Sequence, residues 1–89
     1  MRTLAITSAQ LRAARALLRW SAIDLARKAM VGVNTVRRAE AADDGTSLTA
    51  ANEHAIRRAL EMAGVEFIDE NGGGPGVRLR ERRQPKGRK

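Results

Sequence analysis

Residues 21–40 constrain this chain most, because two short helical patterns there flank a tight break. Ser21 is suited to cap a helix, since its side-chain oxygen can accept a hydrogen bond from an early backbone N–H. Asp24 follows three residues later, where it completes a pattern close to a capping box at the positive end of the helix dipole. We therefore predict a helix that begins after Ser21. Its apolar positions are Ile23, Leu25, Ala26 and Ala29.

A break at residues 30–32 separates this helix from a second short helix, predicted over residues 33–41. Two short helices joined by a tight turn that contains Gly form a helix-turn-helix. The second helix presents hydrogen-bonding side chains at positions i, i+3 and i+4, a spacing that aims them in one direction. Its apolar positions are Val33, Val36 and Ala39, and its polar positions are Asn34, Arg37 and Arg38.

Several positions in residues 10–40 agree with a known pattern at fixed spacing. They are Arg15, Trp20-Ser21, Leu25-Ala26, Val31, Thr35-Val36, Arg38 and Glu40. In these positions the segment resembles the phage-repressor and Cro type (XRE family) of bacterial helix-turn-helix regulators. The resemblance implies a domain of packed helices that binds double-stranded DNA. It also implies a partly buried ion pair between Arg15 and Glu40, which would fix the first helix against the third.

Three positions depart from the family pattern. Many members carry Gln after the capping Ser, where this chain has Ala22. The common Gly-Val-Ser turn is replaced by Met30-Val31-Gly32. A β-carbon disfavours the left-handed backbone conformation, so Met30 predicts a less regular turn than Gly would give. Gly32 is also a weaker helix cap than Ser.

The flanking segments predict two further helices. The first is capped by Thr7 or Ser8, extends to about Arg19, and follows a frayed lead-in at residues 1–6. The other, over residues 50–63, is capped by Thr49 and stopped by Gly64. The expected apolar positions are Leu11, Ala14, Leu17 and Leu18 in the first helix and Ala51, Ala55, Ile56, Ala59, Leu60 and Ala63 in the other.

The C-terminal part changes period. Residues 65–69 have strand composition, residues 71–76 form a glycine-rich turn, and residues 77–80 alternate apolar and basic side chains, which together predict a β-hairpin. Residues 81–89 lack a core pattern and are predicted to be a disordered basic tail. The expected fold class is mostly α: a four-helix helix-turn-helix domain with a small C-terminal β-hairpin, residues 1–80, followed by that tail.

Charge is unevenly distributed along the 89 residues. Residues 1–40 hold eight Lys or Arg against two acids, residues 41–76 hold two against seven, and residues 77–89 hold seven against one. A basic first part and tail favour a polyanion as partner, whereas an acidic middle favours a protein partner or a surface turned away from nucleic acid. The chain has no Cys and no apolar run of membrane-spanning length. These features fit a cytoplasmic, nucleoid-associated protein and no membrane partner.

The predicted second helix of the motif supplies the candidate DNA contacts. Arg38 can bond guanine bidentately, Asn34 can do the same for adenine, and Val33 can touch a thymine methyl, and the family pattern places base contacts at these positions. The candidate phosphate contacts are Ser21, Thr35, Arg37, Arg27 and Lys28. Arg27 and Lys28 have an equally good structural explanation, since they complement the dipole at the end of their helix.

Other residues with possible chemistry have structural explanations. Trp20 is expected to cover the core at a helix junction, and His54 is expected to lie at the surface. Asp43-Asp44-Gly45 predicts a turn in the loop at residues 41–47, without the further oxygen ligands that a cation needs. No catalytic residues, metal ligands or cofactors are predicted.

Three functions remain open. The first is a transcriptional regulator that reads a pseudo-palindromic operator as a homodimer, with subunits that could meet through the hairpin. The second is an antiactivator-type protein that binds another transcription factor through the acidic residues 41–76. The third is a nonspecific nucleic-acid binder that depends on residues 81–89.

Overall fold

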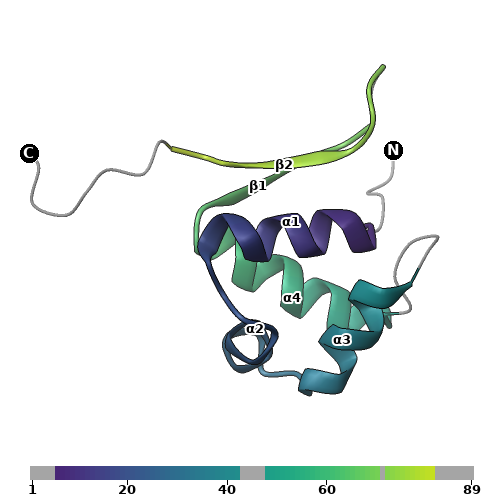
Figure 1. Ribbon diagram of the computed structural model, residues 1–89, viewed down its shortest axis with the longest axis vertical. Coiled ribbons are helices and arrows are strands. Elements are labelled where there is room, and N and C mark those ends of the chain that lie inside the picture. Colours follow the sequence, from purple (N-terminus) through teal and green to yellow (C-terminus); the bar gives the residue numbers. More distant parts are fainter. Residues whose placement is uncertain (1–5, 43–47, 71, 82–89) are drawn as a thin grey trace, which may run out of the picture.

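The chain forms four helices followed by a two-stranded antiparallel hairpin, as predicted (Figure 1). The computed structural model describes residues 6–42, 48–70 and 72–81. Among these residues, no helix is both long and apolar enough to cross a membrane. The elements are α1 (Ser8–Leu18), α2 (Ala22–Ala29), α3 (Val33–Ala41), α4 (Ala50–Met62), β1 (Val65–Ile68) and β2 (Gly76–Leu79).

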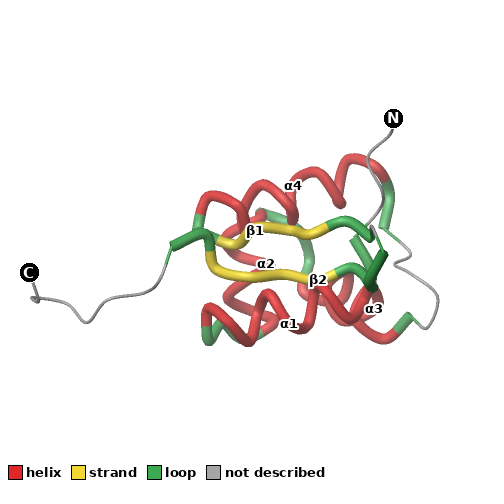
Figure 2. Tube along the Cα trace, turned by 90° about the horizontal axis from the view of Figure 1, so that it is seen from above, coloured by secondary structure: helices red, strands yellow, loops and turns green. Residues whose placement is uncertain are grey.

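The elements are arranged so that the hairpin lies on one side of α1 and α4, while α2 and α3 lie on the other side (Figure 1). Seen from above, the two strands run over the space between α1 and α4, with β1 nearer α4 and β2 nearer α1 (Figure 2). The predicted helix-turn-helix is therefore formed at the end of the molecule remote from the hairpin.

The core is aliphatic, as the near absence of aromatic residues requires. Every helix contributes to it, and much of it consists of Ala, which allows close helix approach but buries little apolar area. Trp20 and Phe67 pack against its margin. The buried residues are Ile6, Leu11, Ala14, Leu25, Ala26, Ala29, Val36, Ala39, Ile56, Leu60 and Val65.

Helix α1 begins with a capping box that also ties the helix to the hairpin. Thr7, not Ser8, is the cap: its hydroxyl accepts from the backbone N–H of Gln10 at 3.0 Å, and the Gln10 side chain accepts from the N–H of Thr7 at 2.9 Å. The Gln10 amide nitrogen donates to the carbonyl of Gly76 at 2.9 Å. Ser8 is buried and donates to the carbonyl of Ala42 at 2.6 Å.

The C-terminal elements form as the sequence predicts. The hydroxyl of Thr49 accepts from the N–H of Asn52 and caps α4, and Gly64, with φ of 109°, follows the helix where a left-handed residue is needed. Strands β1 and β2 pair with Val65 opposite Leu79 and Ile68 opposite Gly76. The hairpin packs on the helices through Phe67, Val77 and Leu79, which contact the core.

Some predicted positions are wrong. The frayed lead-in predicted at residues 1–6 includes Ile6, but the Ile6 side chain is fully buried and its N–H donates to Glu53 Oε2 at 2.9 Å. The predicted apolar faces include Leu17 and Ile23, which are 38% and 47% exposed because each lies at the margin of its helical stripe. Ala51, also a predicted apolar position, is exposed near the start of α4. The predicted turn at Asp43 to Gly45 and the tail beyond Glu81 lie outside the described residues.

Candidate nucleic-acid interface

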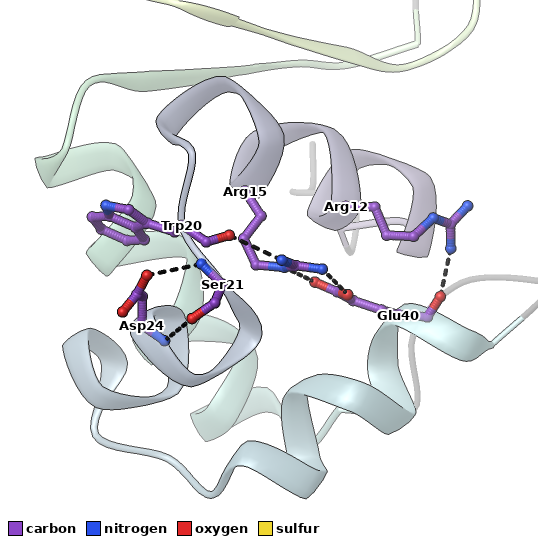
Figure 3. A network of polar contacts seen from close by, with 6 residues as sticks. All are labelled: Arg12, Arg15, Trp20, Ser21, Asp24 and Glu40. Carbon is purple, nitrogen blue, oxygen red and sulfur yellow. Dashed lines mark hydrogen bonds and ion pairs between the residues drawn. The ribbon is translucent and has the colours of Figure 1, made fainter.

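Helix α2 begins at the predicted cap. Ser21 Oγ accepts from the N–H of Asp24 at 2.9 Å, and Asp24 Oδ2 accepts from the N–H of Ser21 at 2.9 Å (Figure 3). The hydrogen bonds from the Ser21 backbone and side chain lower the pKa of Asp24. The stabilisation that this carboxylate gives is thus present above its unfolded pKa and is lost as the pH falls through its folded pKa. Ser21 is exposed, but its hydroxyl is already engaged with Asp24 in the capping box.

The turn between α2 and α3 is left-handed even though Met stands where Gly is usual. Met30 has φ of 61° and ψ of 44°, and the N–H of Val31 donates to the carbonyl of Ala26 at 3.0 Å, which closes the end of α2. The departure at Met30 therefore does not disturb the turn. The Met30 side chain is 88% exposed, so little packing offsets the strain of this conformation.

Helix α3 separates its apolar and polar residues as predicted. Val36 and Ala39 are buried, and the side chains of Asn34, Arg37 and Arg38 are exposed. No hydrogen bond or ion pair within the described part of the chain involves these three side chains. Val33 and Thr35 are half-buried, and Val33 packs partly on the core, which leaves only part of its side chain for a base contact. Gly32 caps the helix without a side-chain hydrogen bond.

The two cations at the end of α2 have different surroundings. Arg27 is exposed, while the Lys28 ammonium lies 5.7 Å from the centroid of the Trp20 ring. This contact is a cation–π interaction, so Lys28 already has a favourable position without a phosphate. Trp20 is half-buried against the core at the junction of α1 and α2, as expected.

Arg15 and Glu40 form the predicted ion pair, with bidentate geometry (Figure 3). The Arg15 Nε and Nη2 atoms donate to the two carboxylate oxygens of Glu40 at 2.7 and 2.8 Å, and Nη1 donates to the Trp20 carbonyl at 2.9 Å. The hydrogen bond to Glu40 raises the pKa of Arg15 above its ordinary value. The side chains are only 25% and 10% exposed. One guanidinium thus joins α1, the start of the motif and the end of α3.

Two further contacts reinforce this junction and were not predicted. The Arg12 guanidinium donates to the backbone carbonyl of Glu40, and the Ser8 hydroxyl donates to that of Ala42. Both contacts use main-chain acceptors at the end of α3. The sequence offers no signal for them, because any residue supplies a carbonyl.

The acidic segment at residues 41–76 uses several of its carboxylates within the chain. Glu61 pairs with Arg57 at 3.5 Å, Glu66 pairs with Arg78 at 3.0 Å, and Glu53 accepts from Ile6. Glu53, with His54 and Arg57, also lines a hollow of about 250 Å³ on α4, and His54 is exposed as expected. Within residues 6–42, 48–70 and 72–81, no three acidic or His side chains are grouped to hold a metal ion.

No protein-family model matches the chain, and no curated protein is significantly similar to it. The resemblance of residues 10–40 to phage-repressor and Cro regulators thus stays an interpretation of the motif. Function is therefore inferred from the side chains that α3 exposes and from the contacts that hold α3.

Replacing Met30 by Gly is expected to stabilise the protein. The change removes the penalty of a left-handed β-carbon and loses almost no packing, so the free energy of unfolding should rise by about 1 kcal/mol. Thermal unfolding of Met30→Gly measures this. Arg27→Gly, in the interior of α2, is the control and should instead lower stability by about 1 kcal/mol. Equal losses in both variants would show that the turn is not strained.

Replacing Arg15 by Ala is expected to destabilise the fold by about 2 kcal/mol, because it leaves the nearly buried Glu40 carboxylate without its cation. Chemical denaturation of Arg15→Ala, Glu40→Gln and the double variant measures the coupling between the two side chains. Arg78→Ala removes an exposed ion pair and should cost less than about 0.5 kcal/mol. An unchanged unfolding midpoint for Arg15→Ala would contradict the role given to the pair.

Proposed function

We propose that this protein is a sequence-specific regulator of transcription that inserts α3 into the major groove of double-stranded DNA. The observation that carries the proposal is the outer face of α3, where Asn34, Arg37 and Arg38 are all exposed and, among the described residues, unpaired. Long polar side chains that already lack internal partners can bond DNA without first breaking bonds within the protein.

Each base contact follows from side-chain chemistry. Arg38 presents two parallel donors that match O6 and N7 of guanine, and Asn34 presents the donor and acceptor that match adenine. Val33 offers its exposed part to a thymine methyl group. Asn34 and Arg38 lie one turn apart on α3, so they address neighbouring base pairs.

The proposed phosphate contacts come from residues around the outer face of α3. Thr35 and Arg37 lie on α3, and Ser21 lies at the start of α2, where its side chain is exposed. Arg27 adds charge at the end of α2. Lys28 is the weakest of these candidates, because it is already placed over Trp20.

A homodimer is the expected active form, because a single α3 of nine residues can address only a few base pairs. Two copies related by a two-fold axis would read half-sites about 34 Å apart, one helical turn of DNA. Such a protein would act in the cytoplasm, in association with the nucleoid.

The structure weakens the case for the alternative, an antiactivator that binds another protein through residues 41–76. Glu53, Glu61 and Glu66 are engaged within the chain, and the turn at Met30 is formed. No observation favours that surface over α3, so DNA is the better-supported partner.

The proposal is tested by selection of bound duplexes from a random library at physiological salt. An enriched motif with two-fold symmetry is expected, and its spacing gives the geometry of the dimer. A chain that ends at residue 80 is the control, because it should select the same motif with a weaker salt dependence. Retention without enrichment, lost as salt rises, would instead indicate nonspecific binding through the tail.

Arg38→Ala is expected to relax base preference at one position in each half-site, with a loss of about 1–3 kcal/mol for the preferred site. Arg37→Ala is the matched control, since loss of a phosphate contact should weaken all sequences evenly. Selection repeated with both variants distinguishes them. An even loss in Arg38→Ala would reassign this residue to the backbone.

A further inference from the structure

The outer edge of β2 carries unpaired backbone groups. The N–H of Arg80 donates to the carbonyl of Gly64 at 2.7 Å, so Arg80 faces β1. Because successive residues of a strand alternate in direction, the N–H and C=O groups of Leu79 and Val77 point away from β1. Within the described residues, these groups have no hydrogen-bond partner. Such an edge can accept a further strand.

Exposed apolar side chains of helix α1 lie beside this edge. We call this surface, formed by Ala13 and Leu17, the α1 ledge. A helix is about 10–12 Å across, whereas paired strands are about 4.8 Å apart, so two helices under two strands must extend beyond the sheet. Figure 2 shows α1 on the outer side of β2. Gln10 marks the face of α1 toward the hairpin, because it bonds Gly76. Leu17 lies on the same face two turns later and is 38% exposed, and Ala13 between them is exposed.

Among the described residues, the opposite edge of the hairpin has no such exposed apolar side chains beside it. Beside β1, the Arg57 guanidinium lies 4.9 Å from the centroid of the Phe67 ring and pairs with Glu61. These polar side chains cover the margin of α4. Only the β2 edge therefore combines open backbone groups with uncovered apolar side chains, among the residues that the structure describes.

We propose that the β2 edge and the α1 ledge bind an extended acidic segment of another protein, which adds to the hairpin as a third strand. The backbone of the segment would bond Val77 and Leu79. Its apolar side chains, at alternate positions, would rest on Ala13 and Leu17. The side chains between them would lie on the outer face of the sheet, on the same side as Arg78 and Arg80.

Charge determines the chemistry of this partner. Arg78 and Arg80 are both exposed, on β2 and directly after it. Arg78 forms an exposed pair with Glu66, which an incoming carboxylate can share. Arg80 donates to the carbonyl of Glu61 and keeps donors for a second acceptor. Acidic residues at alternate positions therefore match this edge.

A second copy of this chain does not fit the same edge. Pairing of β2 with β2 of another copy would bring the two α1 helices together beneath the seam, because each extends beyond its own strand (Figure 2). The helices would meet before the strands reached about 4.8 Å. A lone extended segment has no helix layer and avoids this collision. Any dimer contact through the hairpin must use its outer face instead.

This surface is independent of the proposed DNA contacts. The hairpin and α3 lie on opposite sides of the helix layer formed by α1 and α4 (Figure 1). Occupation of the β2 edge therefore leaves α3 accessible, and loss of DNA binding would not affect the peptide site.

Two synthetic heptapeptides of one composition test the proposal on the full chain. One alternates Glu and Val, and the other has the same residues with the three Val together. We expect the alternating peptide to bind saturably in fluorescence anisotropy and to slow hydrogen exchange at the N–H groups of Val77 and Leu79. Leu17→Asp should weaken it about tenfold, since it removes the apolar ledge.

Ala16→Asp is the matched control, because it adds the same charge one residue away at an exposed position. Apart from a small effect of that charge, this variant should bind the alternating peptide as the wild-type chain does. Thermal unfolding of both variants verifies that they fold. Equal binding of the two peptides, equal loss in the two variants, or unchanged exchange at Val77 and Leu79 would each overturn the proposal. A dimer abolished by Leu17→Asp would also overturn it, since it would assign the edge to a second copy.

Discussion

The bidentate pair between Arg15 and Glu40 is the interaction on which the position of α3 depends. An isolated helix of nine residues is unstable in water, so α3 requires tertiary contacts to exist. Val36 and Ala39 provide apolar contacts on one face, and such contacts are not directional. Arg15 adds directional bonds to the end of the helix, and its third donor reaches the Trp20 carbonyl, where α2 begins. Both helices of the motif are thereby positioned from α1.

The turn after α2 illustrates how tertiary structure can override a local preference. Met30 disfavours a positive φ, yet the burial of Ala26, Ala29 and Val36 on both sides of the turn requires the chain to reverse within three residues. The cost of one left-handed residue is small compared with the loss of those contacts. Consequently the motif tolerates an unfavourable residue at its tightest point, provided that the flanking helices pack well.

Local signals predicted most of the fold. The caps at Thr7, Ser21 and Thr49 and the stop at Gly64 fixed the ends of three helices, since each acts on backbone groups within a few residues. The Arg15–Glu40 pair was foreseen only through a family resemblance, because the partners are 25 residues apart. Burial was mispredicted at the margins of the apolar stripes, where Leu17 and Ile23 are exposed. The burial of Ile6 was also missed, because it depends on segments that no local pattern identifies. Helix periodicity predicts that Asn34 and Arg38 face outward, and both are exposed, whereas Val33 lies on the apolar face of the helix and is half-buried.

Net charge does not distinguish one basic residue from another, but their contacts in the structure do. Arg57 and Arg78 have carboxylate partners, and Arg15 is used to hold the motif. On α3, by contrast, Arg37 and Arg38 have no carboxylate among the described residues and extend from a helix whose other face is fixed. A cation held on a rigid helix loses little conformational freedom on binding and keeps a defined direction. Sequence preference should therefore arise from α3, while the basic C-terminal residues can contribute affinity that is insensitive to sequence.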